Sequence, residues 1–153
     1  MTIRAIIFDI GGVLIDIDWK KYEEDKHLNV QNDFYPYEYE QLNTDLARFV
    51  GDLRPRYKTA TICNGGLRKA MNRKFGLGEL VDLMIFDGEE GVAKPDARIY
   101  QLTLTRLGVQ PDEVVFVDDK ERNVDAAQQL GMHTVHFKNT AQAIAEVQAF
   151  LRI

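Results

Sequence analysis

Five short apolar runs constrain the fold of this chain more than any other feature of its sequence. They occupy residues 5–8, 59–63, 83–86, 114–117 and 134–137. Runs of this length without polar alternation are typical of strands that are buried on both faces, as in parallel sheets. The sequence therefore predicts five buried strands.

Segments with helical spacing separate these runs. The apolar stripes are Leu42, Leu46, Phe49 and Leu53, then Ala97, Tyr100, Leu104 and Leu107, and finally Ile144, Val147 and Leu151. Alternating strands and helices imply right-handed crossovers and helices on both faces of a sheet. We therefore predict an α/β fold: a doubly wound, mostly parallel five-stranded sheet. At 153 residues, the chain has the length of a single domain, covering residues 1–153.

Charge and cysteine content exclude several classes of protein. The formal net charge is −5, from 24 acidic and 19 basic residues, and the two signs are interspersed. Nucleic-acid binding would require an excess of basic residues on one face, so we expect no nucleic-acid partner. No apolar stretch approaches the ~20 residues that span a bilayer, which predicts no membrane partner. The single cysteine excludes an internal disulfide framework, so we expect a cytoplasmic protein.

Polar residues directly follow four of the predicted strands. They are Asp9, the pair Asn64 and Gly65, the pair Asp87 and Gly88, and the pair Asp118 and Asp119. In open α/β sheets, ligands bind beyond the carboxyl ends of the strands. We therefore expect the functional side chains to lie along one edge of the sheet.

Four stretches in order resemble the haloacid dehalogenase-like hydrolase superfamily. They are residues 8–14, 62–65, 91–95 and 116–119, the last with Asn123 close behind. The resemblance covers residues 1–16 and roughly 41–153. It implies a Rossmann-like core and, as in most members, a magnesium-dependent phosphatase acting on a phosphorylated small molecule or protein.

The resemblance implies a nucleophile and a metal site. Asp9 would take the phosphoryl group as an aspartyl-phosphate, which splits one difficult displacement into two steps. Asp9 and Asp119 would bind Mg²⁺ through carboxylates, and Gly11 through its backbone carbonyl. Asp118 would be an additional metal carboxylate or would orient the metal ligands from behind.

The resemblance also implies the residues that hold substrate. Lys94 would hold the nucleophile and the phosphoryl oxygens by its charge. Cys63, Asn64 and Gly65 occupy the positions where the family binds phosphate with a side-chain donor and backbone N–H groups. Asn123 would orient the loop that carries the acidic pair.

Two positions depart from the family pattern. Gly11 stands where active phosphatases of the family have an aspartate that acts as general acid and then as general base. Losing this group is expected to cost about 10²–10⁴ in rate, so we expect a slow enzyme. Cys63 stands where the family has Ser or Thr, and a thiol is a weaker hydrogen-bond donor than a hydroxyl.

Residues 17–40 are the remaining unusual segment. Many relatives insert a large helical cap here, whereas this segment is too short for a core of its own, which predicts a short cap remnant or flap insertion. Residues 19–24 are compatible with one or two helical turns, and the aromatic residues 34–39 with a lid, an interface or local packing. An uncapped site suits a large substrate, or a homo-oligomer in which a neighbouring subunit closes it.

Three other functions are compatible with parts of the sequence. A catalytically impaired protein that binds metal and phosphate for a regulatory purpose would explain Gly11 and Cys63. A receiver-type phosphoacceptor also combines acids and a lysine, but it has its acidic pair after the first strand. A dehalogenase of the superfamily works without metal and lacks the pair Asp118 and Asp119.

Overall fold

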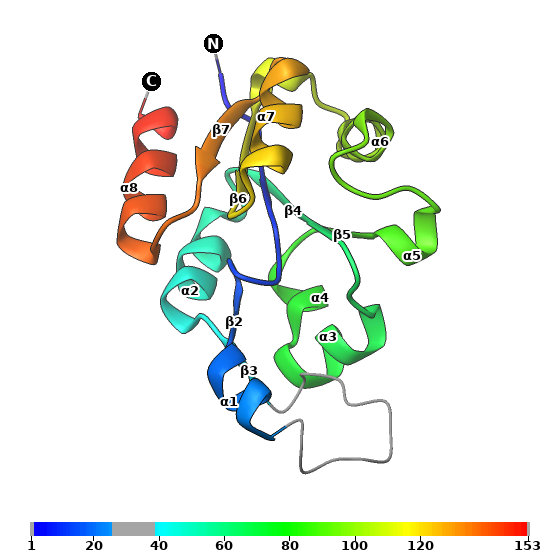
Figure 1. Ribbon diagram of the computed structural model, residues 1–153. Helices are drawn as coiled ribbons and strands as arrows, with labels where there is room; N and C mark the ends of the chain where they lie inside the picture. Colours follow the sequence, from blue (N-terminus) through cyan, green and yellow to red (C-terminus); the bar gives the residue numbers. More distant parts are fainter. Residues whose placement is uncertain (1, 26–38, 153) are drawn as a thin grey trace.

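The computed structural model describes residues 2–25 and 39–152, which contain one parallel five-stranded sheet (Figure 1). Its strands are β1 (Ala5–Phe8), β4 (Lys58–Cys63), β5 (Leu83–Phe86), β6 (Val114–Asp118) and β7 (His133–His136). Their order across the sheet is β5-β4-β1-β6-β7, and every pairing is parallel. The chain therefore moves outward from β1 in one direction and then in the other. The predicted doubly wound sheet is confirmed, and the strand order reverses beside β1.

Helices cover both faces of the sheet. One face packs against α2 (Thr44–Leu53), α3 (Arg68–Phe75), α4 (Leu77–Leu80) and α8 (Thr140–Leu151). The other face packs against α6 (Ala97–Leu107) and α7 (Glu121–Gln129). Figure 1 shows these two layers on either side of the strands. Two short elements, α5 (Asp87–Glu90) and the 3-10 turn Pro111–Glu113, connect strands to helices.

Alternation along β1 divides the core into these two layers. Ile6 and Phe8 belong to the apolar cluster under α2 and α8, whereas Ala5 and Ile7 belong to the cluster under α6. All four side chains are fully buried. A strand whose neighbouring residues point to opposite faces must be apolar at every position to bury both of them. This is why the first apolar run shows no polar alternation.

A small antiparallel sheet stands at the carboxyl edge of the main sheet. It pairs β2 (Ile15–Ile17) with β3 (Glu40–Leu42), and the helix α1 (Trp19–Asp25) follows β2. We call β2, α1 and β3 the flap. The helical turns predicted over residues 19–24 are confirmed by α1. Most of the aromatic segment 34–39 lies outside the described residues, but Tyr39 is buried.

The apolar stripe assigned to residues 42–53 is wrong at its first member. Leu42 lies in β3, opposite Ile15, and the helix α2 begins two residues later. Asn43 sets this boundary because its side-chain oxygen accepts a hydrogen bond from the backbone N–H of Leu46, as an N-cap does. The Asn43 amide also donates to the Thr140 hydroxyl at 2.8 Å, which fixes the base of the flap to α8.

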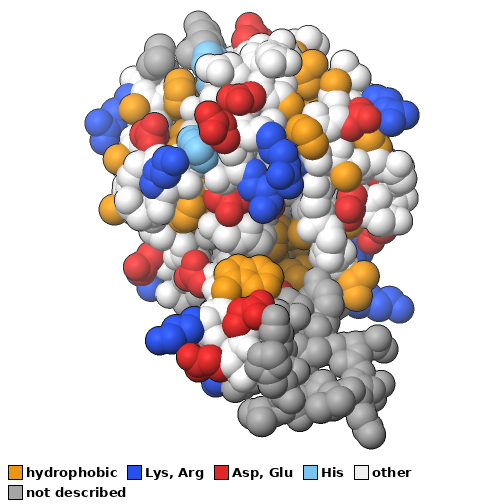
Figure 2. All heavy atoms as spheres, in the orientation of Figure 1, with side chains coloured by type: hydrophobic (Ala, Val, Ile, Leu, Met, Phe, Trp, Pro, Cys, Tyr) orange, Lys and Arg blue, Asp and Glu red, His pale blue; other side chains and the backbone are white. Residues whose placement is uncertain are grey.

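The surface carries charges of both signs. Figure 2 shows acidic and basic side chains interspersed over the face in view, in line with the sequence pattern. Over the described residues, no helix is both long enough and apolar enough to cross a bilayer.

Candidate functional site

Two carboxylates meet where the strand order reverses. Asp9 follows β1, and its backbone N–H continues the sheet ladder by donating to Val117 at 2.9 Å. Asp118 is the last residue of β6, the strand next to β1. Because the two strands run parallel, both acids reach the same edge of the sheet. Both are buried.

Lys94 bridges these two acids. Its Nζ lies 2.9 Å from Asp9 Oδ1 and 2.8 Å from Asp118 Oδ2, and its side chain is only 1% exposed. Burial alone would lower the pKa of Lys94, but the charges of Asp9 and Asp118 outweigh it and raise the pKa above its usual value. The lysine is therefore a permanent cation placed against the Asp9 carboxylate.

Burial has the largest effect on the pKa of Asp9. It raises the pKa of this carboxyl to about 7, against the lowering effect of Lys94 and with a smaller raising effect of Asp118. A buried carboxylate is poorly solvated, so it needs the nearby ammonium group to remain ionised. Asp9 Oδ1 also accepts a hydrogen bond from the Ile10 backbone N–H at 2.8 Å.

Asn64 fixes the position of Lys94. The Asn64 amide donates to the Lys94 carbonyl at 2.9 Å, and the Lys94 N–H donates to the Asn64 side-chain oxygen at 3.1 Å. This reciprocal pair links the end of β4 to the segment before α6. The backbone N–H of Gly65 donates to Asp87 Oδ1 at 2.9 Å. Two of the three predicted phosphate-binding residues, Asn64 and Gly65, thus make contacts within the protein.

Cys63 is the last residue of β4 and faces the same site. Burial, with a smaller contribution from the negative charge of Asp9, raises the pKa of its thiol to about 12. The thiol therefore stays protonated at neutral pH. A Cβ added to Gly66 would lie 2.5 Å from the Cys63 sulfur, so only glycine lets the following loop pass this closely.

The acidic pair after β6 divides into two environments. Asp118 Oδ2 accepts hydrogen bonds from Lys94 and, at 3.2 Å, from the Asn123 amide, and Oδ1 accepts one from the Lys120 N–H. Asp119, in contrast, has a buried Oδ1 without a hydrogen-bond partner among the described residues. A buried oxygen without a partner destabilises the folded protein unless a cation or a hydrogen-bond donor binds it.

These carboxylates fit a divalent cation. Asp9, Asp118 and Asp119 each offer one oxygen, and the three oxygens lie within 4.8 Å of one another. A Cβ added to Gly12 would lie 2.4 Å from Asp119 Oδ2, so the close approach of this carboxylate requires glycine. Carboxylate oxygens suit Mg²⁺, which usually binds proteins through one or two carboxylates and waters. The predicted metal site therefore has a matching donor set.

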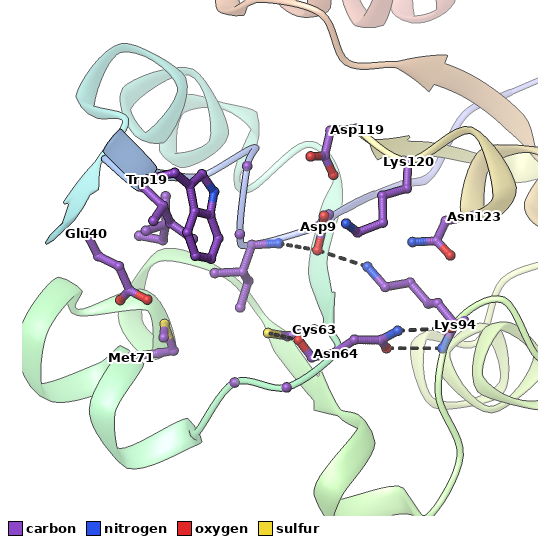
Figure 3. Close-up of a pocket in the computed structure, with 17 residues that line it drawn as sticks. Asp9, Trp19, Glu40, Cys63, Asn64, Met71, Lys94, Asp119, Lys120 and Asn123 are labelled. Atoms are coloured by element: carbon purple, nitrogen blue, oxygen red, sulfur yellow. Dashed lines mark hydrogen bonds and ion pairs between the residues drawn. The ribbon is translucent and has the colours of Figure 1, made fainter. Parts of the chain in front are cut away.

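A cavity of about 290 Å³ adjoins these groups. Figure 3 shows Asp9, Lys94, Asp119 and Lys120 on one side of it, and Trp19, Glu40 and Met71 on the other. Eight of the residues that the sequence assigned to the site line this cavity: Asp9, Gly11, Cys63, Asn64, Gly65, Lys94, Asp119 and Asn123. Asp118 lies behind the cavity wall, where it accepts hydrogen bonds from two lining residues, Lys94 and Asn123.

Sequence reasoning missed the far side of the cavity. Trp19, Glu40 and Met71 come from the flap and α3, and none belongs to a recognisable motif. Only the pairing of β2 with β3, between short segments far apart in sequence, brings Glu40 to the cavity. A single acid in a charged segment carries no signal of this kind.

The sheet is doubly wound, and Asp9, Asp118, Asp119 and Lys94 meet at the point where its strand order reverses. Together they define an α/β protein with an acidic site at the carboxyl edge of its sheet. The model of the haloacid dehalogenase-like hydrolase family matches residues 19–131, and the chain belongs to this family. The match includes Cys63, Lys94 and the acidic pair but begins after Asp9.

Three curated proteins illustrate the sequence likeness. Acyl-CoA dehydrogenase family member 10 of Mus musculus is 41% identical over 70 residues, covering 46% of this chain and 6% of that protein. Phosphorylated carbohydrates phosphatase of Thermotoga maritima is 34% identical over 100 residues, covering 61% of this chain and 46% of that protein. Sesquiterpene phosphatase astK of Aspergillus oryzae is 25% identical over 194 residues, covering 96% of each. The chain thus spans less than half the length of the first two.

Solved structures share the fold. A HAD-like family hydrolase from Porphyromonas gingivalis superposes with a TM-score of 0.79 at 20% identity, covering 100% of both chains. The HAD family enzyme bt-2542 of Bacteroides thetaiotaomicron, an Asp-to-Ala mutant in complex with magnesium and inorganic phosphate, superposes with a TM-score of 0.75 at 19% identity. It covers 89% of this chain and 94% of that one. At these identities the likeness concerns the fold.

Proposed function

We propose that this protein is a magnesium-dependent phosphohydrolase that works through an aspartyl-phosphate on Asp9. The observation that carries the proposal is the buried contact of Lys94 with both Asp9 and Asp118, beside the unpartnered oxygen of Asp119. Phosphoryl transfer depends on a positioned nucleophile and on neutralisation of charge. This cluster supplies both.

The reaction has two displacement steps. In the first, a carboxylate oxygen of Asp9 bonds to phosphorus while the bond from phosphorus to the leaving oxygen breaks, and that oxygen keeps the electron pair. In the second, water attacks the phosphorus, inorganic phosphate leaves, Asp9 returns to a carboxylate, and the proton of the water passes to solvent. Lys94 holds Asp9 in place and neutralises charge in both steps.

The metal would be held by Asp9, Asp119 and the Gly11 carbonyl, with Asp118 positioning the cluster from behind. A bound Mg²⁺ supplies positive charge to the phosphoryl oxygens. Asp118 is suited to the positioning role because its oxygens already accept hydrogen bonds from Lys94, Asn123 and Lys120.

Gly11 makes the enzyme slow toward substrates whose leaving group needs a proton. No side chain stands at the position of the general acid, which costs about 10²–10⁴ in rate. Acyl and aryl phosphates do not need this proton, because their leaving groups are stable as anions. We therefore propose that they are the best model substrates.

The decisive assay compares the wild-type protein with Asp9→Asn on acetyl phosphate and on an aryl phosphate. Turnover by the wild type should require Mg²⁺, disappear with a chelator, and be absent in Asp9→Asn. Equal rates for the two proteins would reject Asp9 as the nucleophile.

A second candidate is a regulatory protein that binds metal and phosphate without efficient turnover. The absence of a side chain at Gly11 favours it, as does Asn64, whose side-chain amide already pairs with the backbone of Lys94. Calorimetry separates the two candidates. Tight binding of Mg²⁺ and phosphate with no hydrolysis across a panel of phosphate esters would favour the binding protein.

The remaining parts of the proposal concern organisation. We propose one core domain over residues 1–153 in which residues 17–40 replace a larger cap, and a cytoplasmic location in line with the single cysteine. The substrate is a phosphorylated small molecule or protein, and a second copy of the chain is a candidate cover for the uncapped face. Light scattering of the purified protein tests the oligomeric state.

A further inference from the structure

Glu40 is a buried acid that the proposed chemistry does not use. It is the first residue of β3, it lines the cavity, and it is only 7% exposed. Its Oε2 is buried and has no hydrogen-bond partner among the described residues. Burial also raises the pKa of this carboxyl, against a lowering effect of the Lys74 charge.

An unpartnered buried carboxylate oxygen needs an explanation. Leaving such a group without a donor destabilises a folded protein, because it has lost the water that solvated it. Lys74 is the nearby cation that acts on Glu40, but it is exposed on α3 and forms no ion pair with Glu40 within the described part of the chain. The missing donor is therefore best supplied by a molecule in the cavity.

Apolar side chains line the part of the cavity that lies between Glu40 and the reacting groups. Figure 3 shows the Glu40 side chain extending toward the space between Trp19 and Met71, on the side of the cavity away from Asp9. Ile10, Ile15 and Ile17 also belong to the apolar lining of the cavity. The cavity volume, about 290 Å³, suits a small ligand.

The two ends of the cavity attract ligand groups of opposite charge. The lysines Lys94 and Lys120 line the end that holds Asp9, where the phosphoryl group would bind. Glu40 is the acidic residue at the other end, and it would repel a second phosphate or a carboxylate. A ligand that spans the cavity must therefore be anionic at one end and cationic, or rich in donors, at the other.

We propose that Glu40 selects phosphomonoesters whose alcohol carries a protonated amine at the far end of a short apolar stem. The ammonium group would donate to Glu40 Oε2 while the phosphoryl group lies at Asp9 and Lys94. This inference rests on the proposed phosphohydrolase function and adds the substrate class to it. Glu40 is a specificity residue here and takes no part in bond breaking.

Binding of non-hydrolysable phosphonates tests this inference without relying on turnover. The probes are 4-(aminomethyl)benzylphosphonate and its neutral partner 4-(hydroxymethyl)benzylphosphonate, each titrated calorimetrically into the protein with Mg²⁺. The wild type should bind the ammonium probe roughly tenfold or more tightly, because a hydrogen bond to a charged group is among the stronger ones. In Glu40→Gln, which keeps the shape of the side chain, the two affinities should agree within about twofold.

Asp16→Asn is the matched control. Asp16 lies in β2 of the same flap, is exposed, and does not line the cavity, so this variant removes one negative charge without touching the site. It should keep the wild-type preference. Equal binding of the two probes by the wild type, or an unchanged preference in Glu40→Gln, would overturn the role of Glu40 and leave the phosphohydrolase intact. Failure of both probes to bind would overturn the proposed substrate class, whereas the phosphohydrolase itself would fall only if acetyl phosphate and an aryl phosphate were also not hydrolysed.

Discussion

The carboxylate of Asp9 and the ammonium group of Lys94 lie 2.9 Å apart, although 85 positions separate them in sequence. The contact is buried, so it has a cost in desolvation that surface ion pairs do not have. The contact fixes the position of the Asp9 carboxyl group at the reversal point of the sheet, where ligands of such folds bind.

Adding the missing acid should accelerate the enzyme. A Cβ placed on Gly11 would meet only Ile17 Cδ1, at 4.0 Å, and the backbone of Gly11 is not left-handed, so Gly11→Asp fits without strain. The variant should hydrolyse alkyl phosphates about 10²–10⁴ faster than the wild type, with a much smaller gain on aryl phosphates. Gly11→Asn controls for side-chain bulk. Equal gains in the two variants would contradict a role in proton transfer.

Removing the bridging cation should destabilise the protein. Lys94→Met leaves Asp9 and Asp118 buried side by side without their common partner. Breaking a buried ion pair in this way costs about 3–5 kcal/mol of unfolding free energy. Urea denaturation measures this loss, and Mg²⁺ should restore more stability to the variant than to the wild type. Lys120→Met removes an exposed lysine and should lose little unfolding free energy. A similar loss of unfolding free energy in both variants would contradict the account.

A hydroxyl at position 63 should improve phosphate binding. The Cys63 thiol is protonated and donates weakly, and serine is slightly smaller, so Cys63→Ser fits beside Gly66. One better hydrogen bond should lower the inhibition constant of inorganic phosphate by about two- to tenfold. Cys63→Ala, which has no donor, serves as the control and should bind phosphate no more tightly than the wild type.

Metal binding should weaken in acid. Burial raises the pKa of Asp9 to about 7 in the metal-free protein, and a carboxylate must be deprotonated to bind Mg²⁺. Affinity should therefore be nearly constant above that pH. It should fall by up to about tenfold for each pH unit below it, since one proton competes with the ion. Calorimetry between about pH 8 and pH 5.5 checks this, and Asp9→Asn should bind weakly without this dependence.

Local patterns were sufficient to predict the main sheet. The apolar run at residues 5–8 has no polar alternation because Ile6 and Ile7 are buried on opposite faces, and that signature is visible in the sequence itself. The helix α6 was equally clear, since its stripe ends at Gly108, which adopts the left-handed conformation at the C-cap.

The flap could not be predicted in the same way. Leu42 fits a helical stripe by spacing, yet Asn43 caps the helix after it and leaves Leu42 to pair with Ile15. Strands of three residues carry almost no periodicity, so only their mutual pairing defines them. For the same reason Glu40 gave no sign of its place in the cavity.

The site was predicted by residue type and order, while the contacts within it were not. The sequence pointed to Asn64 as a phosphate ligand, but whether its amide binds a ligand or the protein depends on the path of the loop around Lys94. Likewise, nothing in the pair Asp118 and Asp119 distinguishes the acid that faces Lys94 from the one with an unpartnered oxygen.

The most direct test of the central claim is mass spectrometry of the intact protein, quenched in acid soon after mixing with acetyl phosphate and Mg²⁺. The account predicts a fraction of the wild-type protein heavier by one phosphoryl group, with the modification mapped to Asp9 and absent in Asp9→Asn. Phosphate release by the wild type without any such adduct, or an adduct that persists in Asp9→Asn, would contradict it.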